Sequence, residues 1–241
     1  MKAIICAAGR GRRMGSFIKK IPKSLLSLGD KTLIENLIFA LSIETIDEII
    51  ILTGYLENKI KNKLGYKFNG KKISYVTNKL FSETNNMYSL FLSKDKIDDD
   101  IIFISGDVYL GQSIVKEFIT SPNPNSILID TNPDYFSDND PVKVTIVDNK
   151  ITSIDKKLPL YETNGVAVGA YKMSYVVFLQ FLDIAEGLIE EGFVEYGYIE
   201  PIKFLLKKHD YIPHLIGGEI WCDIDTPEEY SAINNIMRHK R

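Results

Sequence analysis

Short apolar segments of strand length recur through the first half of the chain, and segments with helical spacing lie between them. Residues 3–7, 48–52 and 100–105 are apolar almost throughout, as strands buried on both faces of a parallel sheet require. Residues 32–41 place leucine and isoleucine at intervals of three and four, which predicts a helix. Alternation of this kind predicts a doubly wound α/β fold with right-handed crossovers.

The pattern changes after residue 130. Residues 131–141 are rich in Asn, Asp and Pro and predict a loop, and residues 142–147 and 151–154 flank a turn and predict a β-hairpin. We therefore expect a mixed, mainly parallel sheet of Rossmann-like type, elaborated by a hairpin. The length of 241 residues alone favours between one and two domains. Because no boundary is visible, we predict a single domain over residues 1–241.

Composition excludes several classes of protein. The 29 Lys+Arg and 32 Asp+Glu give a net charge of −3, and 45% of residues are hydrophobic, which excludes disorder and argues against a duplex nucleic-acid binder. No run approaches the length of a membrane span, and the N-terminal apolar run is too short for a signal peptide. Cys6 and Cys222 fit no disulfide scaffold and no zinc template. We expect a cytoplasmic protein that binds neither membrane nor nucleic acid.

A loop of glycines and arginines, Cys6–Gly15, follows the first predicted strand. A Walker A loop would end in Gly-Lys-Ser/Thr, and a dinucleotide fingerprint would need glycine where Met14 stands. A triphosphate-binding loop accounts for both residue types, because glycine exposes N–H donors and arginine binds phosphate oxygens in bidentate fashion. A solvated basic turn is the remaining alternative.

The loop also carries a family resemblance. Ala7-Ala8-Gly9-x-Gly11-x-Arg13-Met14, followed by Pro22-Lys23, resembles the nucleotidyltransferases with the sugar-phosphate nucleotidylyltransferase fold, over nearly the whole chain. The resemblance implies that Arg13 and Lys23 neutralise phosphates during catalysis. It also implies a set of nucleotide-binding loop residues: Ala7, Ala8, Gly9, Gly11 and Arg12.

Three aspartates are candidate metal ligands. Asp107 ends a predicted central strand, where α/β sheets bind ligands, and Asp223 and Asp225 share one face of a predicted strand. Paired carboxylates repel unless a cation lies between them, and Mg²⁺ prefers such oxygen ligands. The resemblance implies Mg²⁺ at Asp107 and Asp223; Asp225 stands where many relatives have glycine, and phosphocholine-type relatives carry an acidic-Ile-Asp version. Which of Asp223 and Asp225 ligates the metal stays open.

Two further segments indicate substrates. Asn78 and the stretch Asn85-Asn86-Met87-Tyr88-Ser89 resemble the phosphocholine cytidylyltransferase branch, which implies that Asn78, Asn85, Asn86 and Ser89 bind the nucleotide. Asn85 also suits a helix N-cap, and the two roles are compatible. For the acceptor, the resemblance indicates its phosphate at Lys156 or Lys157, with Lys156 preferred, and small pocket residues at Gly165 and Gly169. Glu195, Tyr196 and Glu200 could face a cationic group of the acceptor or form an exposed helix start.

Together these features predict a Mg²⁺-dependent transfer of a cytidylyl group from CTP to a small phosphorylated acceptor, with release of pyrophosphate. An ionised phosphate acceptor needs no general base, so His209, His214 and His239 are expected to have no catalytic role. A sugar-1-phosphate nucleotidyltransferase is the main alternative, together with phosphoglutamine or phosphonate cytidylyltransferases of capsule or phosphonolipid pathways. Met14 stands where a dinucleotide fingerprint needs glycine and argues against a dinucleotide-dependent oxidoreductase. The three intact aspartates argue against a nucleotide-sensing protein without catalytic activity. A monomer or a homodimer is expected.

Overall fold

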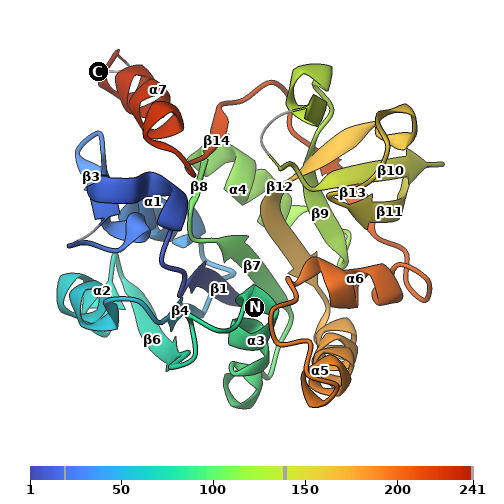
Figure 1. Cartoon of the computed structure of the whole chain (residues 1–241), viewed down its shortest axis with the longest axis horizontal. Helices are drawn as coiled ribbons and strands as arrows, with labels where there is room; N and C mark the ends of the chain where they lie inside the picture. Colours follow the sequence, from blue (N-terminus) through green and yellow to red (C-terminus); the bar gives the residue numbers. More distant parts are fainter. Residues whose placement is uncertain (19, 138–139, 240–241) are drawn as a thin grey trace.

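A ten-stranded mixed sheet crosses the computed structural model, which describes residues 1–18, 20–137 and 140–239 (Figure 1). Its main path runs β11-β10-β12-β7-β1-β4-β6-β5, and β9 joins β12 to β13 off this path. The strands are β1 Lys2–Ala7, β4 Glu48–Thr53, β5 Lys67–Phe68, β6 Lys71–Thr77, β7 Ile101–Ser105, β9 Ser126–Asp130, β10 Lys143–Val147, β11 Lys150–Asp155, β12 Gly165–Met173 and β13 Ile212–Leu215.

The centre of the sheet is parallel. Four neighbouring strands pair in parallel, in the order β7, β1, β4 and β6. β12 runs antiparallel to β7. The predicted hairpin is formed by β10 and β11. The carboxyl ends of the central strands therefore meet at one edge, where ligands of such sheets bind. These observations confirm the predicted α/β class, and the single domain remains a prediction.

Helices cover both faces of the sheet. They are α1 Leu33–Leu41, α2 Glu57–Leu64, α3 Asn86–Phe91, α4 Gln112–Thr120, α5 Tyr175–Glu190, α6 Ile199–Leu205 and α7 Pro227–His239. Successive residues of β1 enter opposite cores: Ile5 packs with residues of α1, α2 and α4, and Ile4 packs with residues of α3, α5 and α6. A strand with two buried faces has no polar side to show, which explains the apolar runs in the sequence.

Side chains define where α1 and α7 begin. Thr32 Oγ1 accepts from the N–H of Glu35, and Glu35 Oε2 accepts from the N–H of Thr32 at 2.7 Å. Thr226 and Glu229 form the same reciprocal pair ahead of α7. Both helices thereby satisfy backbone donors that would otherwise lack partners.

The end of the chain returns to the first half of the molecule. β14 (Trp221–Asp223) pairs with β8 (Val108–Leu110). The sequence pattern did not predict β8. α7 then packs against the small ribbon of β2 (Ser27–Leu28) and β3 (Lys31–Thr32), as Figure 1 shows in red above blue. No helix within the described ranges is long and apolar enough to cross a membrane.

Candidate active site

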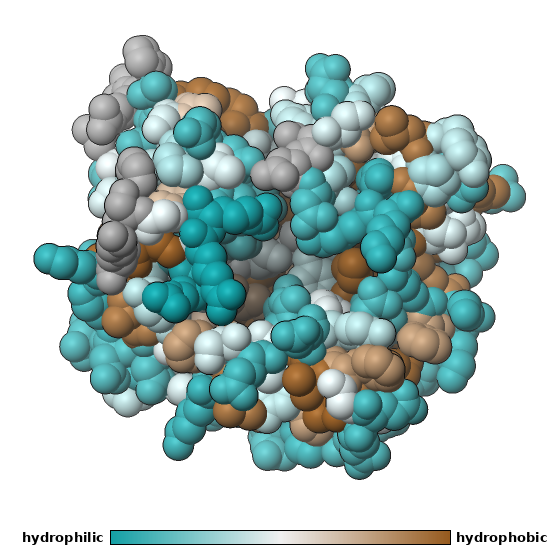
Figure 2. Space-filling model, viewed as in Figure 1, coloured by the Kyte–Doolittle hydropathy of each residue, from teal (hydrophilic) through white to brown (hydrophobic). Residues whose placement is uncertain are grey.

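A cavity of about 720 Å³ opens at the carboxyl ends of β1 and β7. Figure 2 shows it as a hollow in the middle of this face of the molecule, with strongly hydrophilic residues on its rim. Most of the predicted site residues line it: Ala7, Ala8, Gly9, Gly11, Arg13, Lys23, Asn78, Asn85, Asn86, Ser89, Asp107, Lys156, Glu195, Tyr196, Glu200, Asp223 and Asp225. Segments from across the whole sequence therefore meet in one place.

The glycine loop folds over the stem of Lys23. Gly11 has φ +62°, and a Cβ there would lie 3.1 Å from Cδ of Lys23. Any other residue would be strained at this φ and crowd the lysine. Lys23 is thereby buried to 6% exposure, with its ammonium group at the cavity wall.

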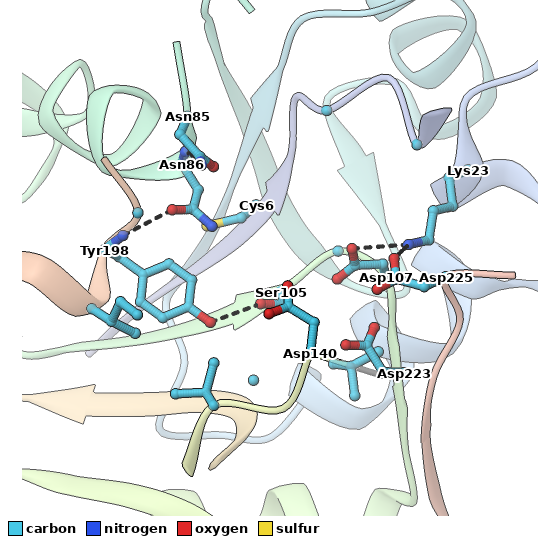
Figure 3. A pocket seen from close by; sticks show the side chains of 18 of the residues that line it. Cys6, Lys23, Asn85, Asn86, Ser105, Asp107, Asp140, Tyr198, Asp223 and Asp225 are labelled. Atoms are coloured by element: carbon cyan, nitrogen blue, oxygen red, sulfur yellow. Dashed lines mark hydrogen bonds and ion pairs between the residues drawn. The ribbon is translucent and has the colours of Figure 1, made fainter. Parts of the chain in front are cut away.

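Carboxylates hold both Lys23, as Figure 3 shows, and Arg13. Lys23 Nζ lies 3.0 Å from Asp107 Oδ2 and 2.5 Å from Asp225 Oδ1, and Arg13 Nη2 lies 2.5 Å from Asp225 Oδ2. Burial by itself would lower the pKa of Lys23, but Asp107 and Asp225 outweigh it, so the pKa is raised. Lys23 therefore stays charged, as a phosphate-binding cation must.

Asp223 completes the acidic group. Asp107, Asp223 and Asp225 each offer an oxygen within 4.8 Å of the others. The carboxylate of Asp223 reaches solvent through the cavity, yet the protein around it removes much of its hydration. This loss, together with the nearby charges of Asp107 and Asp225, raises the pKa of Asp223 well above its ordinary value. Such an all-oxygen, charge-strained set fits a hard divalent cation such as Mg²⁺.

Two backbone features bring these aspartates together. β14 places Asp223 opposite Val108 in β8, and the N–H of Ile224 donates to the carbonyl of Asp107 at 2.9 Å. Before Asp107, β7 passes so close to β1 that a Cβ at Gly106 would lie 2.5 Å from the carbonyl oxygen of Cys6. Only glycine allows that approach.

On the nucleotide side, the predicted asparagines are engaged with the protein itself. Asn78 Nδ2 donates to Thr84 Oγ1 and to Ser89 Oγ, and its Oδ1 accepts from the N–H of Leu80. Asn78 thus orders the loop that leads into α3. Asn85 caps α3, as the sequence predicted.

The acceptor side carries charges of both signs. Lys156 Nζ lies 2.5 Å from Asp140 Oδ2, and both residues line the cavity. Glu200 is 2.7 Å from Lys203 Nζ at the start of α6. Tyr196 stacks on Phe193, with ring centroids 4.8 Å apart and planes 9° apart, and both rings are partly exposed. Lys157 is not among the lining residues.

Two predicted residues lie elsewhere. Arg12 is exposed and does not line the cavity: it sits in a tight 3₁₀ turn, where neighbouring side chains point about 120° apart, and Arg13 takes the inward direction. Gly165 also lies outside the lining. A Cβ there would meet Ile129 Cγ2 at 2.6 Å, so this glycine lets β12 pack on the core. Of the two glycines predicted for the acceptor pocket, Gly169, at a bulge in β12 with φ +79°, lines the cavity.

Several lining residues were not assigned a role from the sequence. Trp221 donates from Nε1 to Asp130 Oδ2 at 2.6 Å, and its ring lies 5.1 Å from that of Tyr135. Tyr198, with its ring buried against Phe103 and Tyr171, also contributes. In the sequence, Trp221 stands two residues before Asp223, and Tyr135 lies in the Asp-rich segment 131–141. This proximity of aromatic and acidic residues could have indicated that both line the site. His209 and His214 lie outside the cavity, and the side chain of His239 lies outside the described residues.

Comparison with known proteins gives consistent results. A family model described as a MobA-like NTP transferase domain matches residues 3–135. The chain is 30% identical to a choline-phosphate cytidylyltransferase of Streptococcus pneumoniae over 100% of both chains. It is 26% identical to a CTP:phosphoglutamine cytidylyltransferase of Campylobacter jejuni, over 93% of this chain and 96% of the relative.

Solved structures agree with the fold. The inositol-1-phosphate CTP transferase of T. maritima superposes with a TM-score of 0.78 at 21% identity, covering 100% of this chain and 96% of the other. At this identity the likeness speaks for the architecture, and it matches the mixed sheet described above.

Proposed function

The chain belongs to the family of the MobA-like NTP transferase domain, and from this premise we propose that it is a Mg²⁺-dependent cytidylyltransferase. In the proposed reaction it transfers CMP from CTP to the phosphate of a small phosphorylated acceptor and releases pyrophosphate. The observation that carries the proposal is the pairing of Arg13 and Lys23 with three aspartates at one wall of the 720 Å³ cavity. Cations for a triphosphate and oxygen ligands for its metal lie side by side.

We assign the metal to Asp107 and Asp223. Asp225 already accepts from both Lys23 and Arg13, whereas the carboxylate of Asp223 makes no hydrogen bond or ion pair within the described residues. When bound, Mg²⁺ supplies charge neutralisation for the triphosphate and fixes its orientation. Asp225 then holds the two cations that bind phosphate oxygens.

The chain's own part in the reaction is positioning and neutralisation. The acceptor phosphate is already ionised, so it attacks the α-phosphorus in line without a general base while the pyrophosphate leaves. Lys23 and Arg13 stabilise the negative charge that develops on the leaving group. The absence of histidine among the described cavity residues is consistent with this chemistry.

For the acceptor we propose a small phosphorylated amine. Lys156, which pairs with Asp140, would exchange that carboxylate for the acceptor phosphate. On the far wall, Glu195, the exposed face of Tyr196 and the carboxylate of Glu200, which pairs with Lys203, would face a cationic group. The relatives named above act on choline phosphate and phosphoglutamine. The proposed location is the cytoplasm, because Cys6 and Cys222 fit no disulfide scaffold.

Pyrophosphate release tests the proposal. Each of the four NTPs is combined with phosphocholine, phosphoethanolamine, phosphoglutamine and glucose 1-phosphate, with Mg²⁺ or with EDTA. We expect release with CTP and a phosphorylated amine, no release in EDTA, and a loss of roughly a hundredfold or more in Asp107→Asn and Asp223→Asn.

An exposed Asn62→Asp variant on α2 serves as the control for handling and folding. Release with glucose 1-phosphate alone would refute the acceptor class. Activity in EDTA, or an unimpaired Asp107→Asn enzyme, would refute the mechanism.

A further inference from the structure

Two asparagines connect the nucleotide wall of the cavity to its acceptor wall. Asn85 donates from its N–H to the carbonyl of Val194 at 3.1 Å and from Nδ2 to the carbonyl of Glu195 at 3.2 Å. Asn86 Oδ1 accepts from the N–H of Tyr198 at 2.9 Å (Figure 3). These hydrogen bonds join residues more than 100 positions apart in the chain.

The segment that they hold, Phe193–Tyr198, is called here the acceptor loop. It carries Glu195 and Tyr196, two of the residues proposed above to meet the acceptor. Its last residue is fixed by the core, because the ring of Tyr198 packs edge-on against the stacked rings of Phe103 and Tyr171. Its middle is exposed, so the bonds to α3 set where Glu195 and Tyr196 stand.

The two polar side-chain atoms of Asn86 have different surroundings. Its Oδ1 is committed to Tyr198, while its Nδ2 has no hydrogen-bond partner within the described residues and the residue lines the cavity. A bound nucleotide can accept from Nδ2 without disturbing the bond to Tyr198. One side chain can therefore contact the nucleotide and hold the acceptor loop at the same time.

We infer that Asn85 and Asn86 are positioning residues for the acceptor, and that through them an occupied nucleotide site fixes the acceptor loop. This inference rests on the proposed function. It differs from the sequence prediction, in which both residues served the nucleotide alone. Linkage requires the reciprocal effect, so a bound acceptor also tightens the nucleotide site.

The test compares variants that remove one bond each. Asn85→Ser keeps a good helix cap but is too short to reach Glu195. Asn86→Ala removes the acceptor of the Tyr198 N–H, and Asn86→Asp restores an oxygen there. The exposed Asn62→Asp variant is the matched control for added charge.

Hydrogen exchange of residues 193–198 is the first measurement, without substrates and with CTP and Mg²⁺. We expect faster exchange in Asn85→Ser and Asn86→Ala, wild-type exchange in Asn86→Asp and Asn62→Asp, and slower exchange in the wild type when CTP is present. Unchanged exchange in Asn86→Ala would overturn the inference, whether or not the protein turns over any acceptor.

Steady-state kinetics with CTP and phosphocholine is the second measurement. In Asn85→Ser we expect the KM for phosphocholine to rise roughly threefold to tenfold, as loss of one hydrogen bond predicts. The KM for CTP, measured at low phosphocholine where the acceptor site is mostly empty, should change little. An equal rise in both KM values would overturn the positioning role. If the wild type releases no pyrophosphate with any acceptor, the proposed function fails, and hydrogen exchange alone decides whether the asparagines hold the loop.

Discussion

The buried lysine of the active site depends on its carboxylate partners. Lys23 is 6% exposed and lies between Asp107 and Asp225. The side chain of Arg13 is half exposed and, among the residues that the structure describes, forms an ion pair with Asp225 alone. A buried charge whose partner is removed is strongly destabilising, and an exposed pair contributes little. Disrupting the ion pairs of Lys23 should therefore lower the stability of the protein much more than disrupting the ion pair of Arg13.

Replacing Lys23 by methionine tests this difference. The variant leaves three carboxylates within 4.8 Å without the cation between them, so we expect a loss of about 3 kcal/mol of unfolding free energy at pH 7. The pKa of Asp223, already raised, should rise further. Because the folded pKa lies above the unfolded value, the loss of stability grows as pH rises and shrinks as pH falls and the group takes up a proton.

Urea unfolding of Lys23→Met at pH 5 and pH 7, with and without Mg²⁺, measures the effect. Arg13→Met is the matched control, with an expected loss of no more than about 1 kcal/mol. An equal loss in both variants, or a penalty independent of pH, would contradict this account of the site.

Among the elements, α7 has the most direct influence on the site, because its first turn holds the backbone of Asp225. Glu229 Oε2 accepts from the N–H groups of Asp225 and Thr226, both at 2.7 Å. Thr226 Oγ1 accepts from the N–H of Glu229 in return. The capping box thus stabilises the helix start and orients an acidic residue of the cavity.

Two alanine variants separate these effects. Thr226→Ala and Glu229→Ala should each lower stability by about 1 kcal/mol through loss of the cap. Only Glu229→Ala also frees the N–H of Asp225, so we expect weaker Mn²⁺ binding in that variant, measured by electron paramagnetic resonance. Glu229→Gln keeps the accepting oxygen and should restore most of the affinity. Equal Mn²⁺ affinity in the two alanine variants would argue against the positioning effect.

At the scale of the whole molecule, ion pairs connect segments that are distant in sequence. Glu35 of α1 is 3.1 Å from Lys63 of α2, Glu48 of β4 is 3.2 Å from Lys72 of β6, and Asp155 of β11 pairs with Lys203 of α6. Burial opposes ionisation of all three carboxyls. Their hydrogen bonds and the nearby lysines outweigh it, so the pKa of each is lowered.

These lowered pKa values predict the acid stability of the protein. A carboxyl whose folded pKa lies below its unfolded value stabilises the fold at neutral pH, and this contribution is lost as pH falls through the folded pKa. We expect the melting temperature to be level above about pH 5 and to fall progressively between about pH 5 and pH 3. Thermal unfolding over this range, with Glu35→Gln as the comparison, checks it. That variant should lose stability at pH 7 and depend less on pH, and a rise in wild-type stability on acidification would contradict the prediction.

The sequence by itself indicated most of the elements and the proposed chemistry of the site. Apolar runs marked the buried strands, helical spacing marked α1, Asn85 marked the start of α3, and the glycine–arginine loop with Lys23 and the aspartates indicated a metal–triphosphate site. These signals are local, because periodicity and capping depend on neighbours within a few residues.

Only the tertiary structure decided which distant residues meet. The tertiary structure pairs β8 with β14 and so places Asp223 beside Asp107. It also forms the bonds from Asn85 and Asn86 to the acceptor loop, and it places Gly169 but not Gly165 in the lining. Such contacts depend on strand register and on a bulge in β12. Shifting a strand by one residue moves each side chain to the other face, and local sequence patterns do not specify that choice.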